Sequence, residues 1–143
     1  MFNIYFQYSN AKGMQQLSVA LDLNQNDIID VYISYGKLQD DTQNHYTHFS
    51  GYLLKGKVVF GAYSSTNAYA STSPLSYSGT TVNVENGMDS STGIFTAPIS
   101  GIYAFHFTAL SDSGYSDHLK LMHNDNQVAG AYQIVPTVSN AHA

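Results

Sequence analysis

The sequence predicts an all-β fold of the sandwich or jelly-roll type. Its 143 residues include twelve Tyr and seven Phe but a single Glu, and 10% of them are charged, against about 25% in an average soluble domain. Tyr, Thr, Val and Ile suit the pleated surface of a sheet, whereas Glu, Lys, Arg and Leu fill surface helices. Apolar residues also recur at every second position in many short segments, which is the periodicity of half-buried strands.

This period-two pattern places nine strands along the chain, separated by residues that favour turns. The expected strands are 17–23, 28–35, 45–54, 58–63, 80–84, 93–96, 101–110, 118–123 and 127–132. The short link at 55–57 makes the third and fourth strands a hairpin. Residues 64–76 are rich in Ser, Thr, Ala and Asn and are expected to form an exposed loop. Residues 2–8 are placed only as an extra or replacement strand.

Charge and cysteine content exclude several classes of protein. The net charge is −5 and the chain has no Arg, so it lacks the basic surface on which phosphate-backbone binders depend. No run approaches the ~18 apolar residues of a membrane-spanning helix, and residues 1–10 lack the pattern of a signal peptide. We therefore expect no nucleic acid and no membrane insertion. The absence of Cys excludes thiol catalysis, disulfides and thiolate zinc sites.

One motif identifies a family. Aromatic, amide and glycine residues recur at fixed intervals at Tyr77, Asn83, Phe95, Gly101, Tyr103, Phe105 and Phe107. This spacing resembles the signature of the complement C1q globular-head family, a branch of the C1q/TNF-like jelly rolls. Tyr77 replaces the usual Phe, and Met88 stands where an aromatic is expected; both are apolar and can fill the same space.

The order of the remaining pieces differs from that of the family. Residues 17–23, 26–31 and 49–54 resemble strands that normally follow the signature, but here they precede it. We therefore expect one domain over residues 1–143 in circularly permuted order: 1–54 resembles the family's C-terminal strands and 58–132 its N-terminal strands. The termini of such a jelly roll lie side by side, so a short link can join them. An engineered permutation is an alternative that the sequence leaves open.

The resemblance implies a ten-stranded jelly roll that assembles as a homotrimer, with aromatic strands packed around the threefold axis. The residues assigned to core and trimer packing are Tyr103, Phe105, Phe107, Phe49 and Tyr52. Independently, the alternation in strand 101–110 places Tyr103, Phe105 and Phe107 on one face, and Ile102, Ala104 and His106 on the other. One face is expected to meet the core and the other a neighbouring subunit.

Catalytic and metal motifs are missing. The chain has no Gly-x-Ser-x-Gly, no His-Glu-x-x-His and only one Glu, Glu85, so we expect no enzyme. His45 and His48 would point to opposite sides of a strand, which disfavours a metal pair. No cofactor is expected, although the oxygen-rich segments 40–44 and 112–117 leave calcium open.

Sugar binding is the remaining candidate function. A sugar needs a flat aromatic surface for its C–H groups and short amide or carboxylate groups for its hydroxyls. Two loops combine both, and their candidate ligand-binding residues are Asp112, Tyr115, Asp117, His118, Asp40, Asp41, Asn44, His45 and Tyr46. The acetamido methyl of an N-acetylhexosamine suits a Tyr pocket, which makes this sugar the favoured ligand.

The sequence thus predicts a non-enzymatic, homotrimeric C1q-like lectin of innate defence. It would be secreted and would bind clustered glycans on microbial surfaces with avidity. The rival hypothesis is a structural or receptor-binding trimer without sugar binding, in which the same Tyr and Phe residues contact protein.

Overall fold

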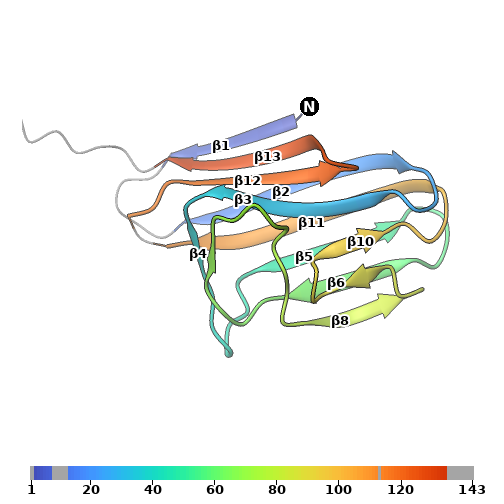
Figure 1. The fold of residues 1–143 in the computed structure, drawn as a ribbon, viewed down its shortest axis with the longest axis horizontal. Helices are drawn as coiled ribbons and strands as arrows, with labels where there is room; N and C mark the ends of the chain where they lie inside the picture. Colours follow the sequence, from blue (N-terminus) through green and yellow to red (C-terminus); the bar gives the residue numbers. More distant parts are fainter. Residues whose placement is uncertain (1, 8–12, 113, 135–143) are drawn as a thin grey trace, which may run out of the picture.

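The computed structural model consists of two twisted β-sheets packed face to face (Figure 1). It describes residues 2–7, 13–112 and 114–134, and the side chains of these from residue 13 onward. Thirteen strands lie in the described part of the chain, and that part contains no helix. The all-β prediction is confirmed.

The strands divide into a six-stranded and a seven-stranded sheet. In spatial order, the first contains β1 (Phe2–Gln7), β13 (Asn126–Ile134), β12 (Asp117–His123), β3 (Ile28–Tyr35), β10 (Ile94–Thr96) and β9 (Met88–Asp89). The second contains β7 (Ala68–Tyr69), β4 (Lys37–Gln39), β11 (Gly101–Ser111), β5 (His48–Leu53), β6 (Val59–Tyr63) and β8 (Gly79–Val84), with β2 (Met14–Leu23) paired to β11. Only β1 and β13 pair in parallel; the other described pairs are antiparallel.

Strand β11 is the centre of the second sheet. It pairs with β2 along one edge, and with β5 and then β4 along the other. Its alternating side chains separate as the sequence predicts: Tyr103, Phe105 and Phe107 are buried, whereas Ile102 is 49% exposed on the outer face. Since successive side chains on a strand point to opposite faces, β11 supplies both the core and an apolar outer surface.

Aromatic rings fill the space between the sheets. Phe60 lies 5.0 Å from Phe49 and 4.8 Å from Phe95, centroid to centroid, distances typical of favourable ring pairs. Gly51 lies among these rings, where a Cβ atom would collide with Phe60 and Phe105. Phe49, Tyr103, Phe105 and Phe107 are buried, as expected, but Tyr52 is 53% exposed and lies outside the core.

Several sequence-based bounds were wrong, and two of these differences bear on the site. The third strand begins at His48 and not at His45, because a carboxylate holds the preceding residues in a tight loop. The segment 64–76 is not simply exposed: Leu75 is buried, and the backbone N–H groups of Ser71 and Leu75 donate to Ile33 and Val31. This segment therefore covers the edge of β3, and it also contributes β7 to the second sheet.

The expected hairpin is present between β5 and β6. The two strands pair antiparallel, and the N–H of Leu53 donates to the Val58 carbonyl at 2.9 Å next to the turn. The link thus joins neighbouring strands of one sheet, as predicted for residues 55–57.

Candidate functional site

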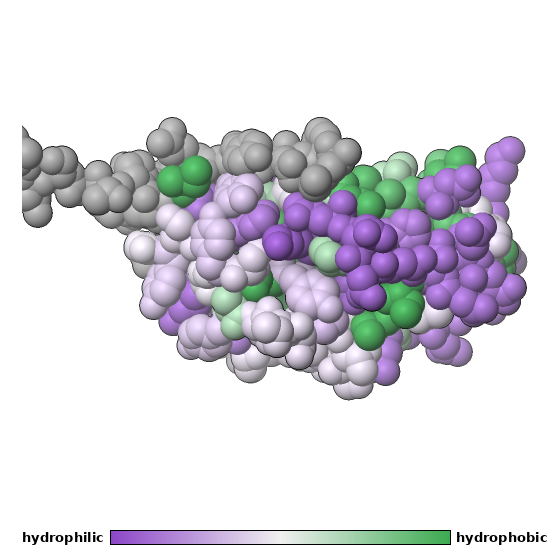
Figure 2. Space-filling view, turned by 45° about the horizontal axis from the view of Figure 1, so that its top comes forward, coloured by the Kyte–Doolittle hydropathy of each residue, from purple (hydrophilic) through white to green (hydrophobic). Residues whose placement is uncertain are grey.

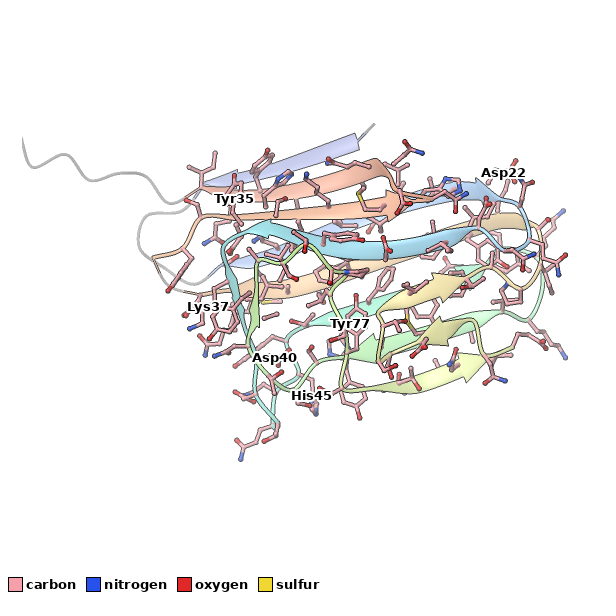
Figure 3. All side chains as sticks on the ribbon, viewed as in Figure 1. Asp22, Tyr35, Lys37, Asp40, His45 and Tyr77 are labelled. Carbon is pink, nitrogen blue, oxygen red and sulfur yellow. The ribbon has the colours of Figure 1, made fainter. Side chains whose placement is uncertain are left out.

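Three loops meet at the end of the sandwich where β4 lies. Lys37, Asp40 and His45 are all at this end, whereas Asp22 is at the opposite end (Figure 3). Strand β4 pairs with β11 on one side and with β7 on the other. It therefore brings the loop after β4, the loop after β11 and the segment around β7 to one place, including both loops predicted to bind a ligand.

Two exposed tyrosines flank a lysine at this end. The Lys37 ammonium lies 5.4 Å from the centre of the Tyr69 ring and 5.8 Å from that of Tyr115. It also lies 3.0 Å from the Asp112 carboxylate, which raises the pKa of Lys37 by hydrogen bonding. Tyr69 is 61% exposed and Tyr115 is 45% exposed. We call Lys37, Tyr69, Asp112 and Tyr115 the lysine–tyrosine cluster.

Asp117 fixes the backbone beneath this cluster. Its Oδ1 accepts a hydrogen bond from the Lys37 N–H at 2.6 Å. Gly36 has φ +102°, and a Cβ there would overlap the Asp117 carboxylate, so glycine is required. Because the carboxylate and the glycine hold the start of β4, the Lys37 side chain leaves the backbone from a fixed point.

The same carboxylate is buried among polar groups inside the sandwich. Gln15 donates to Asp117 at 3.3 Å and to Ser111, and Gln133 lies opposite Asp117 in the register of β12 and β13. Burial raises the pKa of Asp117 to about 6, although hydrogen bonds from Ser111 and Lys37 oppose the rise. Asp117 was expected to face a ligand, but the structure places it in the interior.

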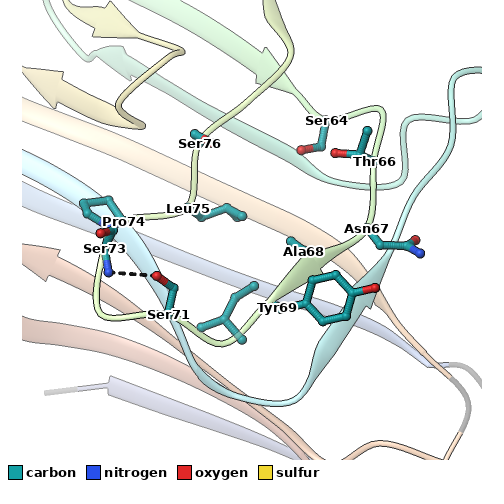
Figure 4. Close-up of a pocket in the computed structure, with 11 residues that line it drawn as sticks. Ser64, Thr66, Asn67, Ala68, Tyr69, Ser71, Ser73, Pro74, Leu75 and Ser76 are labelled. Carbon is teal, nitrogen blue, oxygen red and sulfur yellow. Dashed lines mark hydrogen bonds between the residues drawn. The ribbon is translucent and has the colours of Figure 1, made fainter.

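A cavity of about 320 Å³ adjoins the cluster at Tyr69 (Figure 4). Residues with hydroxyl groups make up more than half of its lining, and Tyr69 is one of them. The lining residues are Ile33, Ser64, Thr66, Asn67, Ala68, Tyr69, Ser71, Ser73, Pro74, Leu75 and Ser76. The volume lies at the lower end of the range for small-molecule sites, and the lining offers both donors and acceptors.

The surface around this end is weakly polar. Pale side chains of intermediate hydropathy cover much of the left half of the visible face, whereas strongly hydrophilic ones gather on the right (Figure 2). Ser, Thr and Tyr have this intermediate character, and they supply more than half of the residues that line the cavity.

The carboxylates in the loop of residues 40–47 accept hydrogen bonds from the loop itself. Asp40 is 7% exposed, and its side chain accepts hydrogen bonds from the N–H groups of Asp41, Tyr46 and Thr47 at 2.8–2.9 Å. The Asp40 N–H in turn donates to Asn67. Asp40 was a candidate ligand-binding residue, but its carboxylate holds the loop closed.

The other candidates in this loop are also engaged by the protein. Asp41 accepts from the N–H groups of Gln43 and Asn44 and from the Asn44 amide; the Asn44 hydrogen bonds lower the pKa of Asp41. His45 lies 2.9 Å from the Ser64 carbonyl and packs edge-on against Tyr63. Tyr46 is half-buried.

His118 is largely buried, on the outer face of the first sheet. Its ring stacks on Tyr132 at 3.9 Å, and its Nδ1 lies 2.9 Å from the Ser34 hydroxyl. Burial lowers the pKa of His118, and Lys120 lowers it further. The adjacent Asp117 carboxylate points into the interior and contacts Gln15 and Lys37, so it does not orient the His118 ring.

Of the nine predicted ligand residues, the lysine–tyrosine cluster contains Asp112 and Tyr115. Sequence reasoning missed Lys37, Tyr69 and the cavity. One signal could have found Tyr69: it is a tyrosine in a segment rich in Ser and Asn, the same pattern that pointed to the other two loops. Among the described residues, no group of three or more His, Cys, Asp or Glu could hold a metal ion.

A second surface lies on the outer face of β2, β11 and β5. A groove of about 400 Å³ crosses these strands and is lined by Ser18, Val19, Ala20, Ser50, Tyr52, Ala104, Phe105 and His106. Next to it, Leu54 is 53% and Ile102 49% exposed. This face is more apolar than the hydroxyl-lined cavity at the end of the sandwich.

Comparison with known proteins identifies the fold family. The C1q domain model matches residues 59–141, more than half of the chain. The chain belongs to the C1q domain family. Its two curled sheets are the C1q/TNF-type jelly roll, which confirms the resemblance read from Tyr77 to Phe107.

Similarity to two curated proteins also supports membership of this family. The C1q-domain chain is 32% identical to complement C1q tumor necrosis factor-related protein 3 of Homo sapiens and of Mus musculus over 77 residues. The match covers 53% of this chain and 31% of each relative, so the chain spans less than a third of their length. No solved structure matches. The described residues contain no helix long and apolar enough to cross a membrane.

Proposed function

We propose that this C1q domain binds carbohydrate at the end of the sandwich formed by β4, β7 and residues 112 and 114–117. One observation carries the proposal: two exposed tyrosines flank a lysine–aspartate ion pair beside a hydroxyl-lined cavity. The tyrosine rings offer flat surfaces for the C–H groups of a sugar, and the ion pair and hydroxyls serve its hydroxyl groups. The activity is binding, with no catalytic step.

The size of the cavity favours a small ligand. A volume of about 320 Å³ suits one sugar unit better than a long chain. We take an N-acetylhexosamine as the first ligand to test, because its acetamido methyl can pack on a tyrosine ring while its N–H donates to an oxygen of the site. Such a ligand on microbial surfaces places the protein outside the cell.

A glycan array with a variant pair tests the proposal. Wild-type protein is expected to bind amino-sugar glycans, and Tyr69→Ala should reduce the signal at least tenfold. Tyr32→Ala is the matched control, because Tyr32 is a partly exposed tyrosine on the other sheet. Equal binding by both variants, or no binding by the wild type, would contradict sugar recognition at this end.

We also propose that the domain assembles as a homotrimer through the outer face of β2, β11 and β5. Tyr52, Leu54 and Ile102 are each about half exposed there, and contiguous apolar surface on a small protein marks an interaction site. Trimerisation would bury this surface and present three sugar sites, which raises the affinity for clustered glycans.

Sedimentation velocity measures the assembly. Ile102→Glu is expected to convert a species near three times 15.6 kDa into a monomer. Ile134→Glu is the control, since Ile134 is 43% exposed but lies on β13 of the other sheet. A wild-type monomer at low micromolar concentration would refute the trimer.

The alternative function is a receptor-binding or structural trimer without sugar binding. The apolar outer face favours this alternative, because aromatic and aliphatic residues dominate the centres of protein interfaces. A trimer that binds no glycan on the array would support it.

We further propose that the chain is a single domain in circularly permuted order. Residues 1–54 would supply the strands that come after the aromatic signature in the usual order of the family. The pairing of β2 with β11 and of β3 with β12 and β10 supports this, because both segments build each sheet. Trypsin should cut the exposed link at Lys55 or Lys57 and leave two fragments that co-elute on size exclusion until denaturant is added. Fragments that separate without denaturant would contradict a single domain.

A further inference from the structure

The Lys37–Asp112 ion pair lies between the two tyrosines, where a stacked sugar would expel water from it. Each of its side chains is about 20% exposed, and the rings on either side are 61% and 45% exposed. A polar group that loses water without gaining a new partner costs binding energy. A ligand that covers the rings must therefore supply hydrogen bonds to the ammonium or the carboxylate.

We propose that the ion pair selects an uncharged sugar through two neighbouring hydroxyl groups. This inference rests on the proposed carbohydrate function and names the ligand class of that site. Lys37 can only donate and an ionised Asp112 can only accept, whereas a hydroxyl does both. One hydroxyl accepts from the Lys37 Nζ, and its neighbour donates to Asp112.

The spacing of the pair fits adjacent hydroxyls. Nζ and Oδ2 are 3.0 Å apart, which is one hydrogen-bond length. Oxygens on adjacent carbons of a pyranose ring are separated by a similar distance, so both contacts can form at once. Hydroxyls further apart on the ring can reach only one member of the pair.

The charges favour a neutral ligand. Asp112 already balances the charge of Lys37. An acidic sugar would therefore meet a lysine whose charge is already neutralised, and its own carboxylate would lie close to that of Asp112. Like charges in contact destabilise a complex, and the net charge of the chain is −5. An acidic sugar is therefore expected to bind more weakly than its neutral counterpart.

The position of Lys37 is set before the ligand arrives. Its N–H is tied to Asp117, Gly36 lies against the same carboxylate, and the Lys37 carbonyl accepts from the Asp112 N–H at 3.0 Å. The backbones of the two ion-pair residues are thus linked to each other. Pre-organisation of this kind lowers the entropy lost on binding.

Calorimetric titration of wild-type protein with a deoxy-sugar series is the main test. The probe is methyl N-acetylglucosaminide, in which only the 3- and 4-hydroxyls are free neighbours. The 3-deoxy and 4-deoxy derivatives should each bind about ten- to hundredfold more weakly, since each loses a hydrogen bond to a charged group. The 6-deoxy derivative should bind nearly as well as the parent, and methyl glucuronide should bind at least tenfold more weakly than its neutral counterpart, methyl glucoside.

Variants locate the effect at the ion pair. Lys37→Met and Asp112→Asn should each weaken binding of the parent sugar at least tenfold, and each should lose the distinction between the parent and the one deoxy derivative that lacks the hydroxyl bound by the altered residue. Lys57→Met and Asp125→Asn are the controls, because Lys57 lies in the β5–β6 link and Asp125 is exposed in the turn between β12 and β13. The deoxy series uses wild-type protein alone, so it remains decisive if a variant fails to fold.

The outcomes separate the two proposals. If no sugar binds, the carbohydrate function itself fails. If the parent binds but Lys37→Met and Asp112→Asn bind it equally well, the function stands and the ion-pair inference is overturned. Tighter binding of methyl glucuronide than of methyl glucoside would overturn it as well.

Discussion

The two loops at the β4 end have nearly the same composition and opposite uses. Residues 40–46 and 112–118 both combine Asp, Tyr and His. In the first loop, the Asp40 and Asp41 carboxylates accept from backbone N–H groups of their own loop. In the second, Asp112 reaches across to Lys37, and Tyr115 is left exposed.

The difference shows what composition alone cannot determine. A carboxylate is an acceptor for a ligand or for the backbone, and a tight loop has N–H groups that no strand partner satisfies. Asp40 precedes a loop that turns back within seven residues, so backbone N–H groups of the loop donate hydrogen bonds to its carboxylate oxygens. The loop after β11 is tied by the Asp112 N–H to the Lys37 carbonyl, and the Asp112 carboxylate pairs with the Lys37 ammonium.

The largest expected effect comes from removing the carboxylate that closes the first loop. Asp40→Ala leaves the N–H groups of Tyr46 and Thr47 without their acceptor, and Thr47 is buried. Unfolding in urea should show a loss of about 3 kcal/mol of stability. Asp40→Asn keeps one oxygen and should lose less; a loss below about 1 kcal/mol for Asp40→Ala would contradict a structural role.

The second prediction concerns the buried end of the other loop. Burial raises the pKa of Asp117 to about 6, above its ordinary value near 3.9. A raised pKa in the folded state means that the folded protein binds this proton more tightly than the unfolded chain does. The stability that protonated Asp117 contributes is therefore full below about pH 4, and it is lost as the pH rises through about 6. The free energy of unfolding should fall by up to about 3 kcal/mol over this range.

Asp117→Asn checks this sign, since an amide does not titrate there and its oxygen can still accept from Lys37. The fall in stability between pH 4.5 and pH 7.5 should become smaller in the variant. Asp30, whose pKa burial also raises to about 6, adds a fall of the same sign, so the variant is not expected to be flat. An unchanged pH profile in Asp117→Asn would exclude Asp117 as a source.

The fold could be predicted from the sequence more fully than the site. Alternation in 101–110 placed Tyr103, Phe105 and Phe107 in the core because a strand has only two faces. The strand start at His48 could not be predicted, because it depends on hydrogen bonds from Tyr46 and Thr47 to Asp40. Period-two patterns contain no information about such side-chain acceptors.

The site depended on contacts between distant segments. Lys37, Tyr69 and Tyr115 meet because β4 pairs with both β7 and β11, and strands of two or three residues are too short to show a pattern. The burial of Asp117 likewise depends on Gln15, which is 102 residues away in the sequence. Composition could mark residues 112–118 as a candidate, but it could not tell which of its aspartates faces outward.

A smaller loss of stability is expected at the surface of the first loop. Asp41→Ala removes an acceptor for the N–H groups of Gln43 and Asn44, but these groups are exposed and water can replace it. The free energy of unfolding in urea should fall by about 1 kcal/mol, with no change in glycan binding. A loss as large as that of Asp40→Ala would mean that the two aspartates do not differ in role.

The smallest effect on stability, and the clearest on binding, is expected for Tyr115→Ala. Its ring is 45% exposed and lies over Lys37, so truncation should change the free energy of unfolding by no more than about 0.5 kcal/mol. Sugar affinity should nevertheless fall at least tenfold, because the variant loses one of the two stacking surfaces. Asp40→Ala at low temperature, where it remains folded, should show the reverse: reduced stability with sugar affinity near that of the wild type. If Tyr115→Ala binds sugar as tightly as the wild type, the second loop takes no part in recognition, and the contrast between the two loops is one of packing alone.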